Sequence, residues 1–319
     1  MIVSSASVKA KAAALGFLAS GITDPGPMPH AVELEQWLER GYAGTMRYLH
    51  RQAERRKDPG KIMPEARSVV VVLDNYYSDE VDASLPRVAR YARGRDYHLV
   101  LSERLTDLAA YLTEAGATRC RVFADAGPVP ERELAQRAGL GWIGKNTMLI
   151  RPGAGSFFFI GSIFTDLLLD RDHPFEMDRC GTCTKCLTAC PTGAIVAPRV
   201  LDATRCISYL TIEYQGTFTE EQPELHGWGF GCDICNDVCP WNARFAETGR
   251  ESAYPARGPL AEAGPDYFDA LTEAEFQEKF SDTPLERPGL AGMRRNWRAA
   301  LAGGKHPDIP HSPSADGHT

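Results

Sequence analysis

The sequence predicts an α+β protein in which a larger domain of alternating helices and strands precedes a cysteine-rich domain and a short helical segment. The chain has 319 residues and 43% hydrophobic content, enough for a core several times that of a small cysteine-rich domain. Helical and strand periodicities alternate through residues 1–165, and eight of the nine cysteines fall between Cys180 and Cys239. We therefore place the domains at 1–165, 166–245 and 246–302, and expect a disordered tail at 303–319.

Each element follows from a local pattern. Apolar positions at helical spacing predict helices over residues 7–20, 30–42, 98–115 and 131–138. Apolar, β-branched or aromatic runs predict strands at 68–73, 118–124, 147–150 and 156–164. The run SVVVVL at 68–73 is continuous, which is typical of a central strand buried on both faces. Further helical stretches lie between residues 268 and 302.

The cysteines form two ferredoxin-like motifs. The first is Cys180-x2-Cys183-x2-Cys186-x3-Cys190-Pro191, and the second joins Cys206 to Cys232-x2-Cys235-x3-Cys239-Pro240. Such spacing is typical of two 4Fe-4S clusters, in which the cysteine before proline binds the other cluster. The predicted ligand sets are Cys180, Cys183, Cys186 and Cys239 for one cluster, and Cys190, Cys206, Cys232 and Cys235 for the other.

Zinc sites and disulfides are the alternatives for these cysteines. The repeated motif with both prolines is not a zinc-finger spacing. The first residues, MIVSSASVKAKAAALGF, lack the pattern of an export signal, so we expect a cytoplasmic protein with reduced thiols. No apolar segment is long enough to span a bilayer. Cys120 is left over and is interpreted as a core residue.

The net charge of −7 argues against indiscriminate binding to nucleic acid. Three local basic stretches nevertheless leave a polyanionic partner open, although such runs are usually solvated faces. They comprise Arg47, Arg51, Arg55, Arg56 and Lys57; Arg87, Arg90, Arg93 and Arg95; and Arg294, Arg295 and Arg298.

Candidate chemistry outside the cysteines is less specific. Gly139-x-Gly141-x-x-Gly144 matches a dinucleotide fingerprint in spacing, but it follows a predicted helix, so we discount NAD and FAD there. Asp125 ends a predicted strand, where a buried carboxyl with a raised pKa could deliver a proton. An Asx-turn or helix cap is the competing interpretation of Asp125. Asp96 similarly could cap the helix that contains His98.

Several motifs together resemble one family. They are Met63-Pro64-Glu65-Ala66-Arg67-Ser68-Val69 behind Arg56, Arg93-Gly94-Arg95-Asp96-Tyr97-His98, Asp125-x-Gly127-Pro128-Val129-x-Glu131-Arg132, Gly141-Trp142-Ile143-Gly144-Lys145-Asn146 and the cysteine motif from Cys180 to Ile195. Over roughly residues 1–300, the chain resembles epoxyqueuosine reductase. The resemblance implies reduction of epoxyqueuosine to queuosine at the tRNA wobble position, the last step of queuosine biosynthesis.

The resemblance also implies cofactors and site residues. The N-terminal domain would be nitroreductase-like and bind base-off cobalamin, and the two clusters would reduce it to cob(I)alamin. Asp125 matches the family's proton donor, and burial would give it a raised pKa. Arg56 matches an arginine that contacts the corrin. Tyr97, His98, Lys145, Asn146 and Ser156 are further candidates for the pocket.

Two positions depart from patterns seen in corrin proteins. Leu101 stands where the pattern Asp-x-His-x-x-Gly has its glycine, so we expect the cobalt to lack His98 as a lower ligand. Ala89 aligns with a cysteine that some family members place near the cobalt.

The implied partners are a tRNA anticodon stem-loop, held by the basic stretches Arg47–Lys57 and Arg294–Arg298, and an external low-potential electron donor. We expect a monomer. The alternatives are a reductive dehalogenase and an iron-sulfur electron carrier without a substrate. The first usually carries an export signal, and the second does not explain the large N-terminal domain.

Overall fold

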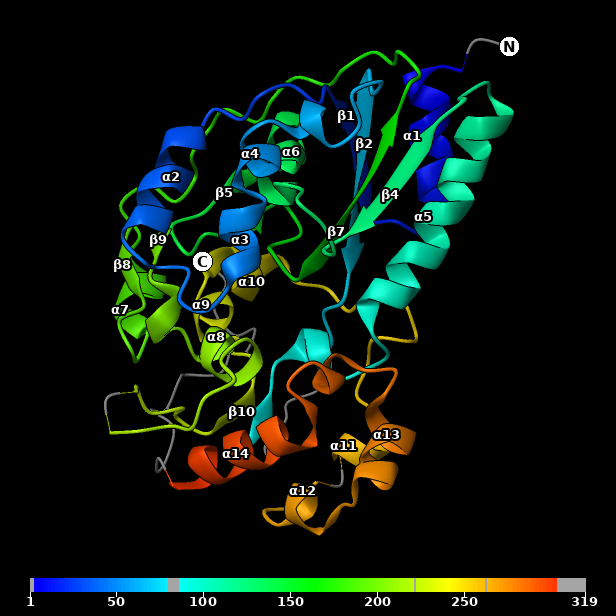
Figure 1. Ribbon diagram of the computed structural model, residues 1–319. Helices are drawn as coiled ribbons and strands as arrows, with labels where there is room; N and C mark the ends of the chain where they lie inside the picture. Colours follow the sequence, from blue (N-terminus) through cyan, green and yellow to red (C-terminus); the bar gives the residue numbers. More distant parts are fainter. Residues whose placement is uncertain (1–2, 80–85, 221, 262, 303–319) are drawn as a thin grey trace, which may run out of the picture.

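A four-stranded sheet organises the N-terminal part of the computed structural model, which describes residues 3–79, 86–220, 222–261 and 263–302 (Figure 1). The strand order is β1 (Ala19–Thr23), β2 (Ser68–Asn75), β7 (Phe158–Thr165) and β4 (Cys120–Ala124), with antiparallel neighbours throughout. β2 is an interior strand, buried from Ser68 to Asp74, as predicted for the valine run. The predicted tail at 303–319 lies outside the described residues.

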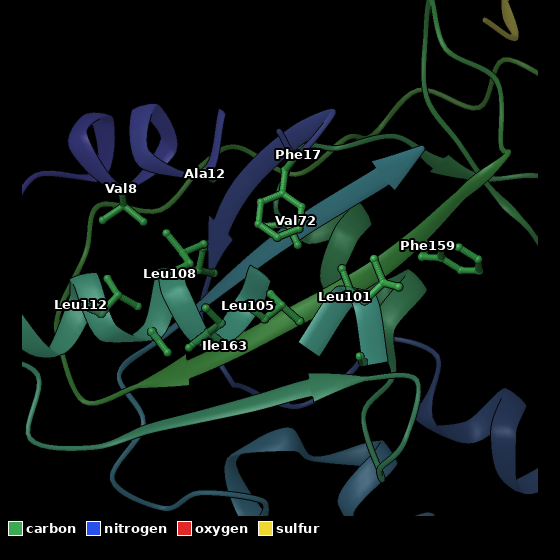
Figure 2. Close-up of a cluster of buried hydrophobic side chains, with 14 of the residues drawn as sticks. Val8, Ala12, Phe17, Val72, Leu101, Leu105, Leu108, Leu112, Phe159 and Ile163 are labelled. Atoms are coloured by element: carbon green, nitrogen blue, oxygen red, sulfur yellow. The ribbon is translucent and has the colours of Figure 1, made fainter. Parts of the chain in front are cut away.

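Helices cover both faces of the sheet. α1 (Ser5–Ala14) and α5 (Tyr97–Glu114) pack on one face against Val70 and Val72, where Leu105 and Ile163 meet (Figure 2). α6 (Glu131–Arg137) packs on the other face, against a core that contains Val69 and Val71. Because successive strand residues point to opposite faces, the valine run supplies both cores. Each fully buried side chain of this size contributes about 1.5–3 kcal/mol.

The first strand was not predicted. The helix expected over residues 7–20 ends at Ala14, and Gly16 follows with a φ of 87°. The backbone N–H of Leu18 then donates to the carbonyl of Leu73, which starts the pairing of β1 with β2. Pairing with the buried strand β2 therefore overrides the helical pattern of these residues. The segment after α6 forms a short hairpin of β5 (Trp142–Ile143) with β6 (Leu149–Ile150). β6 lies within the strand predicted at 147–150, whereas β5 was not predicted.

The remaining elements lie between the strands of the sheet, in the cysteine-bearing part and in the C-terminal part (Figure 1). Between the sheet strands lie α2 (Ala31–Glu39), α3 (Arg47–Arg51), α4 (Ala53–Lys57), β3 (Arg87–Val88) and the 3-10 turns Pro59–Lys61 and Arg90–Ala92. The cysteine-bearing part contains α7 (Lys185–Ala189), β8 (Ile195–Ala197), β9 (Val200–Leu201), the 3-10 turn Ala203–Arg205, α8 (Ile207–Ile212), β10 (Trp228–Phe230), α9 (Ile234–Asp237) and α10 (Pro240–Phe245). It is followed by α11 (Gly258–Ala261), α12 (Tyr267–Ala270), α13 (Glu273–Phe280), the 3-10 turn Pro284–Glu286 and α14 (Gly289–Ala302), which include the predicted C-terminal helices.

The N-terminal part packs against the cysteine-bearing and C-terminal parts. The indole Nε1 of Trp37, on α2, donates to the carbonyl of Leu201 at 2.6 Å, and the N–H of Thr45 donates to the Tyr209 hydroxyl at 2.8 Å. Tyr254, which follows the cysteine-bearing part, packs into the hydrophobic core that includes the buried residues of α5. β3 also pairs in parallel with β10. None of the described helices combines the length and apolar run needed to cross a membrane.

Candidate functional site

All nine cysteines are free, and eight of them gather in two groups. Burial raises the pKa of Cys186 and Cys239, and neighbouring thiols of the set Cys180, Cys183, Cys186 and Cys239 raise each further. The thiols of Cys206, Cys232 and Cys235 show the same pattern, with Cys190 as a neighbour, and Cys186 also raises the pKa of Cys235. These influences follow the predicted ligand sets except for the one between Cys235 and Cys186. The role of the cysteines as ligands stays a prediction.

Among the described residues, no three His, Cys, Asp or Glu side chains converge closely enough to hold a single metal ion. A 4Fe-4S cluster binds each thiolate through a different iron, so it needs a wider set of four sulfurs than one ion does. Two separate groups of four thiols therefore fit the chemistry of a two-cluster domain.

A buried polar seam fixes one side of the second group. Asn146 Nδ2 donates to the carbonyl of Cys235 at 3.2 Å, and Ser156 Oγ lies 3.2 Å from Asn236 Oδ1. Asn242 completes the seam, since its Nδ2 donates to Ser156 Oγ at 2.9 Å. Asn146 and Ser156 were candidates for the cofactor pocket. The structure places their polar atoms against the segment that bears Cys235, and none of their described contacts reaches Asp125.

Asp125 lies at the centre of a tight turn directly after β4. Its φ is 58°, in the left-handed region, and the N–H of Ala126 donates to the carbonyl of Ala124 at 2.5 Å. This three-residue turn is strained for a non-glycine residue. The turn directs the carboxylate toward α5, where the Tyr97 hydroxyl donates to Asp125 Oδ2 and His98 Nε2 lies 3.6 Å from it.

Tyr97 and His98 are held from their other sides. The Tyr97 ring stacks on Phe159 of β7, with centroids 4.1 Å apart and planes 7° from parallel. Asp96 caps α5 by accepting from the backbone N–H of His98, and its Oδ1 also lies 2.7 Å from His98 Nδ1. Carboxylates thus flank both ring nitrogens of His98. Its expected absence from the lower-ligand position stays a prediction.

The expectation of a raised pKa for Asp125 is wrong. Burial raises its pKa, but the hydrogen bonds from His98 and Tyr97 lower it more, so the net shift is downward. His98 takes the opposite shift: burial lowers its pKa, but Asp125 and Asp96 raise it to about 9. Glu131 also has a raised pKa, about 8, because of burial and the nearby charge of Asp125. At neutral pH this network therefore carries its protons on His98 and Glu131.

Arg56 joins this network from α4. Its Nη2 donates to the carbonyl of Gly127 at 2.8 Å and its Nη1 to that of Val129 at 3.2 Å. Its Nε is buried without a partner among the described residues. Arg56, expected to contact a corrin, therefore has most of its donors on the segment that follows Asp125.

Asp125 is connected to the second thiol group through two tyrosines. The Tyr97 hydroxyl donates to Asp125 Oδ2, and the Tyr91 ring lies edge-on to the Tyr97 ring, with centroids 6.2 Å apart. Tyr91 also packs on the same hydrophobic cluster as Cys206 and Cys232. The Asp125 side chain is 58% exposed, so its carboxylate can be reached from solvent. A redox cofactor between the thiols and the carboxylate would fit this arrangement.

The three basic stretches differ in their partners. Arg47, Arg51 and Arg55 are exposed, and their side chains make no hydrogen bond or ion pair within the described part of the chain. Internal contacts occupy the other two stretches. Arg90 pairs with Asp233 and Asp237, Arg93 donates to the Val88 carbonyl, Arg95 pairs with Glu103, Arg294 donates to Phe268, Arg295 to Tyr214, and Arg298 pairs with Asp269. In the first stretch Arg56 and Lys57 also make internal contacts, so Arg47, Arg51 and Arg55 are its members that remain available for a polyanion.

Comparison with known proteins agrees with this geometry. Residues 179–242 match the family described as "4Fe-4S double cluster binding domain", and residues 56–126 match "Epoxyqueuosine reductase QueG, DUF1730". A protein from Cyclobacterium marinum named epoxyqueuosine reductase is 40% identical over 296 residues, which cover 91% of this chain and 94% of the relative. The chain belongs to the epoxyqueuosine reductase family.

Solved structures of epoxyqueuosine reductases have the same fold. One contains an epoxyqueuosine-modified tRNA-Tyr stem loop; it is 30% identical, has a TM-score of 0.83, and the match covers 93% of this chain and 80% of that one. A second, from Bacillus subtilis, is 31% identical with a TM-score of 0.82 over 93% of this chain and 81% of that one. In it, a catalytic loop named for an aspartate is swung out of the active site.

Glu131 belongs to the sequence motif that begins at Asp125, but the sequence alone assigned it no function in this member of the epoxyqueuosine reductase family. The structure brings its carboxyl group to the backbone of Asp125, at 2.8 Å. Its place at the start of a helix, six residues after Asp125, was the available signal. Tyr91 was missed entirely, because nothing in its local sequence indicates that it lies between Asp125 and Cys206.

Proposed function

We propose that this chain reduces epoxyqueuosine in tRNA to queuosine, the final step of queuosine biosynthesis. The observation that carries the proposal is that Tyr91 contacts both Tyr97, the partner of Asp125, and the hydrophobic cluster on which Cys206 and Cys232 pack, in a chain of this family. The reaction takes in two electrons and two protons. Two C–O bonds break, the oxygen leaves as water, and a carbon–carbon double bond forms in the cyclopentane ring.

The proposed organisation places a nitroreductase-like, cobalamin-binding domain at residues 1–165 and the two 4Fe-4S clusters at residues 166–245. Cobalamin, when bound in its base-off form and reduced to the cobalt(I) state, supplies the electron pair that opens the epoxide. Tyr97 and His98 would border it beside Asp125, and Arg56 would offer only its Nε. Asn146 and Ser156 would support the second cluster indirectly, through hydrogen bonds to the segment that bears Cys235.

The chain's own residues supply the proton. Asp125 has an exposed carboxylate and is the group that would protonate the leaving oxygen. Since its pKa is lowered, the proton resides on His98 at neutral pH and passes to Asp125 as the oxygen gains charge. Asp96 remains against His98 throughout and keeps the ring oriented. In this proposal the Asp125 turn corresponds to the catalytic loop of the Bacillus subtilis relative.

The proposed partners follow from the same site. A tRNA anticodon stem-loop, as bound by the relative solved with one, would lie on the exposed arginines of α3 and α4. The wobble nucleotide would be extruded toward the Asp125 carboxylate. An external low-potential donor would reduce the clusters. We place the reaction in the cytoplasm because tRNA is its substrate, and we expect a monomer.

The test is anaerobic reconstitution with iron, sulfide and cobalamin, followed by incubation with epoxyqueuosine-containing tRNA and a strong reductant. Mass spectrometry of the nucleosides should show queuosine only when cobalamin is present. Cys183→Ala should abolish reduction of the cobalt by the external donor; activity that survives loss of this cluster would exclude the proposed electron path. If both clusters assemble but no corrin binds and the epoxide persists, the electron-carrier interpretation replaces this one.

A further inference from the structure

The turn at Asp125 requires external support. The left-handed region is unfavourable for a non-glycine residue, and the described contacts of Asp125 include no side-chain bond to its own turn that would offset this strain. The six residues from 125 to 130, which we call the Asp125 loop, connect the end of β4 to the start of α6. Something outside the loop must therefore hold its backbone in this shape.

Two side chains, those of Glu131 and Arg56, contact that backbone. Glu131 Oε1 accepts a hydrogen bond from the N–H of Asp125 at 2.8 Å. Arg56 donates to the carbonyls of Gly127 and Val129 at 2.8 and 3.2 Å. Together these side chains bind three of the six residues of the loop through the main chain. Such contacts restrain the backbone whatever the side chains of the loop are.

We infer that Arg56 and Glu131 are positioning residues that clamp the Asp125 loop inward, so that the Asp125 carboxylate stays against Tyr97 and His98. The inference rests on the proposed function only for the role of Asp125 as proton donor, and the clamp itself is argued from the contacts. Without the clamp, relaxation of the strained turn would carry the carboxylate away from its two partners. The clamp thus accounts for how a strained loop remains in its working position before substrate arrives.

The charges around Glu131 suit this task. Burial and the Asp125 carboxylate raise the pKa of Glu131 to about 8, while Arg132 and Arg56 act in the opposite direction. At neutral pH Glu131 is therefore uncharged, and it accepts from the Asp125 amide without placing a second negative charge beside the carboxylate. A glutamine has the same shape and the same acceptor oxygen, so it should replace Glu131 in the clamp.

The decisive experiment measures hydrogen exchange by mass spectrometry on the cluster-loaded protein without substrate, for Glu131→Ala and Glu131→Gln. Peptides covering residues 124–130 should exchange roughly tenfold faster in Glu131→Ala, the effect of one lost hydrogen bond, and at the wild-type rate in Glu131→Gln. Glu133→Ala is the matched control. It lies on the same helix but pairs with His30 instead of the loop.

Turnover provides the second readout. In Glu131→Ala, kcat should fall roughly tenfold while KM for the tRNA is unchanged, and Glu131→Gln should restore kcat. If Glu131→Ala fails to fold, Arg56→Lys gives the same comparison, because a lysine keeps the charge but lacks the two-pronged donor.

Unchanged exchange in both Glu131→Ala and Arg56→Lys would overturn the clamp. Faster exchange with an unchanged kcat would show that the loop position does not matter for the reaction, and would also overturn the inference. If the wild-type protein forms no queuosine, the proposed function fails, but the exchange rates still decide whether the clamp exists.

Discussion

The indole Nε1 of Trp142 donates a hydrogen bond to Cys180 Sγ across 3.4 Å. Trp142 is fully buried, and its ring packs against Phe175 and Trp241, so the donor is fixed in place. A hydrogen bond to a cluster sulfur favours the reduced, more negative form of the cluster. Trp142 should therefore raise the reduction potential of the cluster that Cys180 is proposed to bind.

Replacement of Trp142 by Phe should lower that potential. The loss of one hydrogen bond, about 1 kcal/mol, corresponds to roughly 40 mV for a one-electron couple. A potentiometric titration followed by electron paramagnetic resonance measures the shift. Trp241→Phe is the control, since its indole N–H has no acceptor within the described residues. Equal potentials in Trp142→Phe and wild type would exclude this influence.

Asp125→Asn should retain both clusters and bound corrin but lose turnover by roughly 10²–10⁴-fold, because amide replaces the group that transfers a proton. Iron content, the corrin absorption spectrum and queuosine formation give the three measurements. Turnover near the wild-type value would refute the assignment of Asp125 as proton donor.

The activity of the wild-type protein should decline as pH rises through about 9. His98 has its pKa raised to that value, so above it the proposed proton source is lost. The stability that His98 contributes follows the same sign: it is fully present below about pH 6.5 and disappears as pH passes the folded-state pKa. Rate profiles of wild type and His98→Gln measure this. A wild-type decline that persists unchanged in the variant would assign it to another group.

Substitution of the exposed arginines Arg51 and Arg55 by Gln should weaken binding of the tRNA stem-loop. Each lost phosphate contact should reduce the slope of log K against log salt concentration by roughly 0.7–0.9. Fluorescence anisotropy at several salt concentrations measures both quantities. Arg298→Gln serves as the comparison because Arg298 already pairs with Asp269, and it should leave the slope unchanged. If Arg298→Gln reduced the slope and the Arg51 and Arg55 substitutions did not, the tRNA would bind at α14 instead of at α3 and α4.

Asp74→Ala should destabilise the protein by roughly 3–5 kcal/mol, because it removes the buried carboxylate that pairs with Arg104 and accepts from Tyr254. Arg104 then keeps the Glu251 carboxylate as its acidic partner, at 3.8 Å. The Asp74 carboxylate is 2% exposed and accepts from Arg104 Nη1 at 2.5 Å and from the Tyr254 hydroxyl at 2.6 Å. Denaturant unfolding measures the loss. Asp107→Ala, at an exposed position on the same helix as Arg104, should change stability little. Equal losses would mean that the buried contacts are not decisive.

Local sequence patterns predicted the features that are determined by residues close together in the sequence. The valine run from Ser68 identified the interior strand, and the spacing of the cysteines identified a two-cluster domain. The strand at Ala19 escaped prediction because its only reason to be extended is pairing with residues about fifty positions away.

The candidate site shows the same limit. The end of β4 and the resemblance pointed to Asp125, but the direction of its pKa shift depends on Tyr97, which lies 28 residues away in sequence. Asn146 and Ser156 were recognised as candidates, yet their hydrogen-bond partners come from residues 80 to 90 positions later. Contacts between distant segments leave no periodicity in the local sequence.

The reciprocal packing of Trp37 on Leu201 and of Tyr254 on Asp74 bears on how the molecule can be divided. A chain cut at residue 165 would leave the first fragment without the tyrosine that closes its core, and the second without the indole that covers β9. Neither fragment should therefore be an autonomous folding unit. Thermal unfolding of the intact protein should accordingly proceed as one cooperative event, with cluster release and loss of the sheet at the same temperature.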